Sequence, residues 1–131
     1  MFSVPLPTGL SEVQVRQLSP AALAYIGDAV YELYVRGLYL FPPKRLADYH
    51  KQVVSQVRAE RQAVTLRSLE DDLTEDEKDL LRKGRNAASR ASRRVDPEIY
   101  QHATSLEALI GYLYLTNPSR LAQLLSRLEL E

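Results

Sequence analysis

The sequence contains no cysteine, and this absence removes several kinds of chemistry at once. A chain without thiols forms no disulfide, holds no cysteine-ligated zinc and has no thiol nucleophile. Five Gly and seven Pro in 131 residues are too few for a low-complexity chain. The sequence also lacks the motifs of a serine-hydrolase elbow, a P-loop, a dinucleotide fold or a zinc site. Enzyme classes built on those motifs are therefore excluded.

Uncharged hydrophobic runs of membrane-spanning length are also missing. The most apolar stretch, residues 18–41, carries Asp28, Glu32 and Arg36 near its middle. Each of these charges would cost about 2.5–3.5 kcal/mol at the centre of a bilayer. The N-terminus shows no basic start followed by the apolar block of a signal peptide. We therefore expect a protein without a membrane segment, located in the cytoplasm.

The formal net charge is zero, but charge is unevenly distributed. Residues 70–79 carry seven acids and one Lys, and residues 82–94 carry six bases and no acid. The basic segment is either a binding site for a polyanion or a solvent-exposed loop whose charge balances that of residues 70–79. The residues alone favour neither alternative. The candidate polyanion contacts within it are Arg82, Lys83, Arg85, Asn86, Ser89, Arg90, Arg93 and Arg94.

Helical signals run along nearly the whole chain, and no window shows the alternation of a strand. We predict one all-α domain over residues 1–131, with an irregular segment over residues 1–10. The expected helices are a short one at 11–18, a long one from Pro20 to the Pro42-Pro43 pair, one at 44–69, one from 75 to about Gly84, a short turn at 96, one at 104–115 and one from 117. Residues 85–95 are expected to form a loop.

Asp28 belongs to the only polar stripe of the long helix, together with Glu32 and Arg36. Such a stripe faces either a wet cleft or ordinary solvent, where a Glu32–Arg36 pair contributes a few tenths of a kcal/mol. Gly27 favours the cleft, because a glycine inside a helix costs about 1 kcal/mol relative to alanine. We infer that another backbone approaches this helix beside the Asp28 carboxylate.

Glu107 is the second candidate acid, and it also lies among small residues, with Ala103 and Gly111 four positions away on either side. Thr104 and Glu107 fit a capping box, in which Glu107 would only satisfy a backbone N–H. Gly27 and Gly111 together would let their two helices approach closely enough for both carboxylates to share an ion.

These residues carry a resemblance to the ribonuclease III family. AYIGDAV (residues 24–30) resembles the signature helix of that family, and TSLEALIG (residues 104–111) resembles its second acidic motif, in the same order. KGRN (residues 83–86) and GYLYL (residues 111–115) are similar to the mini-ribonuclease III subfamily, which has the catalytic domain without a double-stranded-RNA-binding domain. The similarity extends over residues 18–128. Three of the usual acid positions fall on Ala21, Ala24 and Thr104, which leaves Asp28 and Glu107.

The resemblance implies a dimeric, helical endonuclease-domain fold that cleaves double-stranded or structured RNA. It implies Mg²⁺ held by Asp28 and Glu107, and a metal-activated water that leaves 5′-phosphate and 3′-hydroxyl ends. The implied substrate is the large-subunit (23S) ribosomal RNA precursor, with a ribosomal protein as a candidate helper. A homodimer is expected to pair across Ile26, Val30, Tyr31 and Leu33. The alternatives are a helical RNA-binding module without catalysis and a dimeric adaptor without a nucleic-acid ligand.

Overall fold

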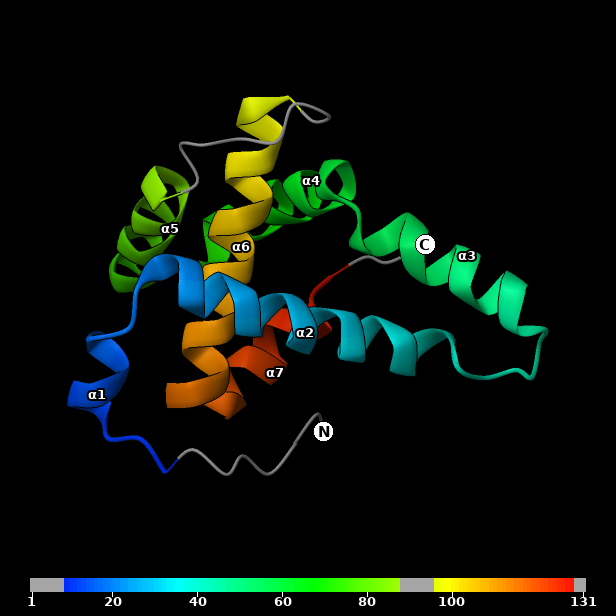
Figure 1. Ribbon diagram of the computed structural model, residues 1–131, viewed down its shortest axis with the longest axis horizontal. Helices are drawn as coiled ribbons and strands as arrows, with labels where there is room; N and C mark the ends of the chain where they lie inside the picture. Colours follow the sequence, from blue (N-terminus) through cyan, green and yellow to red (C-terminus); the bar gives the residue numbers. More distant parts are fainter. Residues whose placement is uncertain (1–8, 88–95, 129–131) are drawn as a thin grey trace.

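The computed structural model describes residues 9–87 and 96–128, and every regular element in these ranges is a helix (Figure 1). The all-α prediction is therefore confirmed. Within the same ranges, no helix combines the length and apolar content that crossing a membrane requires. The elements are α1 (Glu12–Arg16), α2 (Pro20–Tyr39), α3 (Leu46–Val57), α4 (Ala59–Leu69), the 3₁₀ turn η1 (Glu70–Asp72), α5 (Glu75–Ala87), α6 (Pro97–Thr116) and α7 (Pro118–Ser126).

Local side-chain hydrogen bonds start the helices where the sequence predicts. Ser19 caps α2, with Pro20 in the first turn. The capping box before α5 is formed, because Thr74 N donates to Glu77 Oε1 at 2.9 Å and Glu77 N donates to Thr74 Oγ1 at 3.1 Å. The Glu77 carboxylate also accepts from Arg120 of α7, with Arg120 Nε at 2.9 Å from Glu77 Oε2. The hydrogen bonds from Arg120 lower the pKa of Glu77 more than burial raises it.

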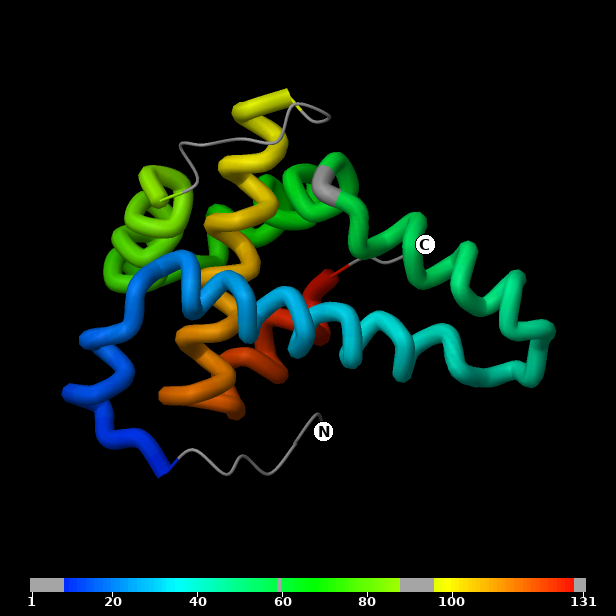
Figure 2. The backbone as a smooth tube through the Cα atoms, viewed as in Figure 1, coloured from blue at the N-terminus to red at the C-terminus, as the bar shows by residue number. Residues whose placement is uncertain are grey.

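The prediction of one helix over residues 44–69 is wrong, because the chain bends at Arg58. Arg58 is extended, with φ −67° and ψ 155°, and it separates α3 from α4. The residues around the bend include neither Gly nor Pro, so the sequence gives no local signal for it. The physical reason is tertiary: α3 packs against α2, whereas α4 packs against α6, and one straight helix would not reach both. Figure 2 shows the change of direction after the α2–α3 hairpin.

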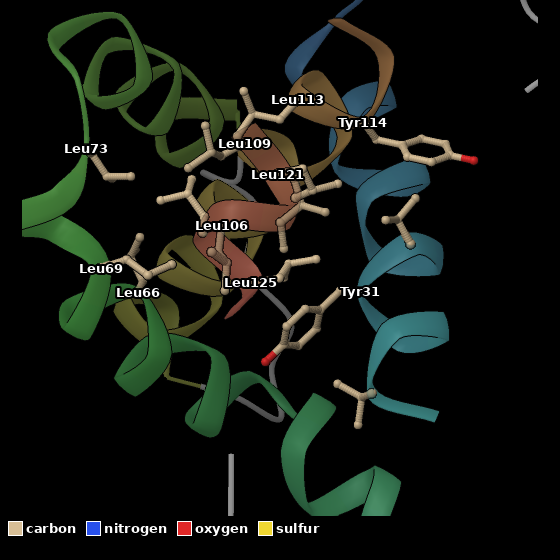
Figure 3. Packing of buried hydrophobic residues seen from close by; sticks show 14 of the residues in the cluster. Tyr31, Leu66, Leu69, Leu73, Leu106, Leu109, Leu113, Tyr114, Leu121 and Leu125 are labelled. Atoms are coloured by element: carbon tan, nitrogen blue, oxygen red, sulfur yellow. The ribbon is translucent and has the colours of Figure 1, made fainter. Parts of the chain in front are cut away.

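The second half of the chain is built on α6, which is longer than predicted. It begins after Asp96, whose Oδ1 accepts from Glu98 N at 2.8 Å, and continues without a break to Thr116. The predicted boundary at Thr104 is therefore wrong. Helix α6 contacts α2, α4, α5 and α7. Its leucines fill the core, and Figure 3 shows Leu106, Leu109 and Leu113 of α6 surrounded by side chains from the other helices.

Glycines allow two helices to press directly against α6. A Cβ on Gly27 of α2 would lie 1.7 Å from the Glu107 carbonyl oxygen, and a Cβ on Gly111 of α6 would lie 2.0 Å from the Leu23 carbonyl oxygen. The predicted close approach of these two helices is therefore confirmed. Gly84 has a similar role: it does not end α5, as predicted, but lies inside the helix, where a Cβ would be 3.0 Å from Ser105 Cα.

A Gly27→Ala substitution should destabilise the fold, because the added methyl group overlaps the α6 backbone. We expect a loss of about 3 kcal/mol or more in the free energy of unfolding, measured by urea denaturation. Gly37→Ala is the matched control on the same helix, since a Cβ there meets no atom within 4 Å. That control should stabilise by about 0.5–1 kcal/mol. Equal effects of the two substitutions would contradict the proposed helix contact.

Candidate active site

Asp28 lies on the exposed side of α2, immediately after the glycine that touches α6. The other members of its stripe pair with each other, because Arg36 Nη2 lies 2.6 Å from Glu32 Oε1. The ordinary surface pair predicted as the alternative is thus present. That pair does not include Asp28. Asp28 interacts instead with the carboxyl group of Glu107.

Glu107 is half-buried in the middle of α6, at the point where Gly27 meets the α6 backbone. It is ten residues past the first residue of the helix, Pro97, so it cannot cap the helix start. The capping box suggested by Thr104 and Glu107 is therefore excluded. The Glu107 side chain is free for another role beside Asp28.

The carboxyl group of Glu107 interacts directly with that of Asp28. The pKa of Glu107 is raised from 4.5 to about 8, first by burial and then by the hydrogen bond and negative charge of Asp28. A hydrogen bond between two carboxyl groups requires one of them to be protonated. Like charges at this distance disfavour double ionisation, so the pair tends to hold one proton near neutral pH.

Gln62 is a third member of this cluster, and the sequence analysis missed it. Its Nε2 lies 3.5 Å from Glu107 Oε2 and 2.6 Å from the Val57 carbonyl oxygen. Its hydrogen bond to Glu107 lowers the pKa of that carboxyl group, which opposes the larger effects of burial and of Asp28. Nothing in the sequence marks position 62, because its place beside Glu107 depends on the bend at Arg58.

Two carboxylates and one amide suit a hydrated hard cation better than a fully protein-ligated one. The described part of the chain has no group of three or more His, Cys, Asp or Glu able to hold a metal. Mg²⁺ keeps several waters and is often bound by one or two carboxylates together with phosphate oxygens. A cation bound by Asp28 and Glu107 would also offset the negative charge of Asp28 that raises the pKa of Glu107. The residues present therefore fit Mg²⁺.

The basic segment is described only at its start, where it forms the end of α5. Arg82 and Lys83 are exposed and pair with Asp79 one turn earlier, with Lys83 Nζ at 3.3 Å from Asp79 Oδ2. Arg85 and Asn86 are exposed on the last turn of the helix, not in a loop as predicted. The remaining predicted RNA contacts, Ser89, Arg90, Arg93 and Arg94, lie outside the described residues.

The residues predicted at a dimer interface do not share one surface. Val30 and Tyr31 are buried inside the protomer, and Figure 3 shows Tyr31 pointing from α2 into the core. They offer no surface to a partner, because the helices of their own chain already cover them. Ile26 is half-buried against the core, whereas Leu33 is 49 % exposed. The helical pattern misled the prediction because α2 is apolar on most of its circumference.

The raised pKa of Glu107 predicts how stability depends on pH without metal. Between about pH 4.5 and about pH 8 the folded state binds a proton that the unfolded chain has lost. The free energy of unfolding should therefore fall as pH rises through this range. Glu107→Gln should remove this dependence and raise the melting temperature at pH 8 by a few degrees. Thermal unfolding in EDTA tests this, with Glu32→Gln as control. Parallel pH curves for wild type and Glu107→Gln would contradict it.

Comparisons with known proteins identify the family of this chain. The Ribonuclease III domain model matches residues 21–118. Mini-ribonuclease 3 of Synechocystis sp. is 59% identical over 116 residues, which cover 88% of this chain and 81% of that protein. Mini-ribonuclease 3 of Thermosynechococcus vestitus is 52% identical over 123 residues, covering 94% and 82%. A crystal structure of a Fusobacterium nucleatum protein matches with a TM-score of 0.78 at 29% identity, covering 85% of this chain and 93% of that one. The chain therefore belongs to the ribonuclease III family of endoribonucleases.

Proposed function

We propose that this protein cleaves double-stranded regions of structured RNA with Mg²⁺ held between Asp28 and Glu107. The observation that carries the proposal is the pair itself: two carboxyl groups from different helices are held together at the α2–α6 contact, and one of them has a pKa of about 8. Perturbed carboxyl groups of this kind concentrate at functional sites.

The proposed reaction is hydrolysis of one phosphodiester bond. When bound, Mg²⁺ supplies an acidified water and neutralises charge on the phosphate. Asp28 and Glu107 would hold the ion at the scissile phosphate. The water oxygen forms a bond to phosphorus, the bond from phosphorus to the 3′ oxygen breaks, and a proton passes to that oxygen. The products are a 5′-phosphate and a 3′-hydroxyl end.

RNA is proposed to lie along the basic end of α5 and the segment that follows it. Arg85 and Asn86 are exposed on the last turn of α5, and α5 packs directly on α6, which carries Glu107. Contacts to phosphates and 2′-hydroxyl groups read the shape of an A-form helix rather than its bases. Arg82, Lys83, Ser89, Arg90, Arg93 and Arg94 complete the proposed surface in the sequence.

The proposed natural substrate is the precursor of the large-subunit (23S) ribosomal RNA, in the cytoplasm. The similarity to proteins called Mini-ribonuclease 3 supports a ribonuclease, and the choice of this precursor follows from the family resemblance of residues 18–128. Because the proposed contacts recognise shape, a ribosomal protein that folds the precursor is the helper that we expect.

A homodimer is proposed across the exposed face of α2, in place of the buried positions first predicted. Tyr25 is 86 % exposed, and it shares this face with Leu33 and Ala29. Large apolar side chains on one outer face favour a protein partner. A twofold axis across this face would place two Asp28 side chains on opposite strands of one duplex.

Asp28→Asn should abolish metal-dependent cleavage, because an amide does not bind Mg²⁺ as a carboxylate does. Removing a residue that hydrogen-bonds to a metal ligand typically lowers activity by about 10–100-fold. Removing the ligand itself should have a larger effect, so we expect the cleavage rate to fall by more than about 100-fold. The assay is cleavage of a labelled RNA hairpin with Mg²⁺ or EDTA. Glu32→Gln, one turn away in the Arg36 pair, should cleave normally. RNA binding by wild type without any cleavage would favour the non-catalytic module instead.

Leu33→Glu should separate the proposed dimer, because it puts a charge into an apolar contact. Sedimentation equilibrium should show a dimer for wild type and a monomer for this variant. Val13→Glu is the matched control, since Val13 is an exposed apolar residue of α1, 66 % accessible. A wild-type protein that remains monomeric at high concentration would exclude the dimer while leaving the cleavage proposal intact.

A further inference from the structure

Gln62 is a buried amide in contact with one of the two carboxyl groups of the proposed site. It projects from α4 and is 3 % exposed. Its Nε2 lies between the Val57 carbonyl oxygen, at 2.6 Å, and Glu107 Oε2, at 3.5 Å. The carbonyl oxygen only accepts hydrogen bonds, and so does an ionised carboxylate. The amide orientation is therefore fixed, with the nitrogen facing both groups.

The other end of the same amide is not satisfied. Gln62 Oε1 is buried and has no hydrogen-bond partner among residues 9–87 and 96–128. A buried acceptor without a donor destabilises the fold, and an apolar side chain of similar size would avoid that cost. Packing alone therefore does not explain a glutamine at this position. The amide nitrogen does, because it donates both to the Val57 carbonyl oxygen and to Glu107.

The short hydrogen bond to the Val57 carbonyl oxygen holds the Gln62 amide in place. The same amide can then make its longer and weaker hydrogen bond to Glu107. Val57 is the last residue of α3, so its carbonyl belongs to the bend that separates α3 from α4. An amide held at this bend presents a fixed N–H to one oxygen of Glu107. A donor on one oxygen restricts rotation of the carboxylate and leaves its remaining lone pairs for a cation.

We propose that Gln62 is a positioning residue that holds the Glu107 carboxylate in its metal-binding orientation. This inference rests on the proposed function, because it assumes that Asp28 and Glu107 bind a divalent cation. Gln62 acts through Glu107 and is assigned no contact with the ion or the RNA. The bend at Arg58, for which the sequence gives no local signal, therefore places Gln62 beside Glu107.

Binding of Mn²⁺, followed by electron paramagnetic resonance of the free ion, tests the proposal apart from catalysis. Gln62→Met keeps the length of the side chain and removes both donors, and we expect it to weaken Mn²⁺ binding about tenfold. In a Glu107→Gln background the same change should have no further effect, because the group that Gln62 orients is gone. Gln56→Met is the matched control: Gln56 is also a buried glutamine, 4 % exposed, and accepts from Arg61 Nε instead. It should leave Mn²⁺ binding unchanged.

Nuclear magnetic resonance of the wild-type protein gives a second test that does not depend on a variant folding. The side-chain amide signals of Gln62 should shift when Mg²⁺ is added, whereas those of Gln56 should not. If wild type neither binds Mn²⁺ nor cleaves RNA, the proposed function fails and this inference fails with it. If wild type does both, while Gln62→Met keeps its Mn²⁺ affinity and the Gln62 signals do not move, only the role of Gln62 is overturned.

Discussion

The direct contact between the backbones of α2 and α6 is the constraint on which the rest of the structure depends. It is reciprocal: Gly27 lies against Glu107, and one turn away Gly111 lies against Leu23. Because Asp28 follows Gly27, the contact that joins the two helices also joins the two carboxyl groups. Their proximity is thus a result of backbone packing and not of any attraction between the side chains, which repel each other when ionised.

The free energy that holds the carboxyl groups together comes from the opposite side of the same helix. Leu106, Leu109 and Leu113 of α6 are almost fully buried, and each such side chain contributes about 1.5–3 kcal/mol. Glu107 lies on a different side of α6 from these leucines, beside Asp28. The core therefore offsets an electrostatic cost at the site, as is common where a site needs groups in an unfavourable ionisation state. The buried, half-satisfied amide of Gln62 adds to that cost in the same place.

The sequence predicts the features that depend on near neighbours, such as the start of α2 at Pro20 and of α5 at Glu75. It also predicts the α2–α6 approach, because a glycine inside a helix is a local cost that calls for a distant cause. It does not predict the bend at Arg58 or the continuity of α6 through Thr104, since tertiary packing decides both. The face that α2 offers to a partner is hidden from the sequence for a related reason: a helix apolar on most sides does not reveal which side its own chain covers.

The structure also bears on why Asp28 and Glu107 are the only acids that remain among the positions named by the family resemblance. Ala24, where the resemblance places one of the missing acids, is 7 % exposed and packs with Val15 of α1 and Ala108 of α6. A carboxylate at that position would be buried among apolar side chains, at a cost of several kcal/mol unless it were paired. The apolar cluster around Ala24 therefore disfavours an extension of the site at this position. Under the proposed function, the ligands that the protein does not provide come from water and from the RNA phosphate. Metal and RNA must then each raise the affinity for the other by the same factor, because coupling between two binding equilibria is reciprocal.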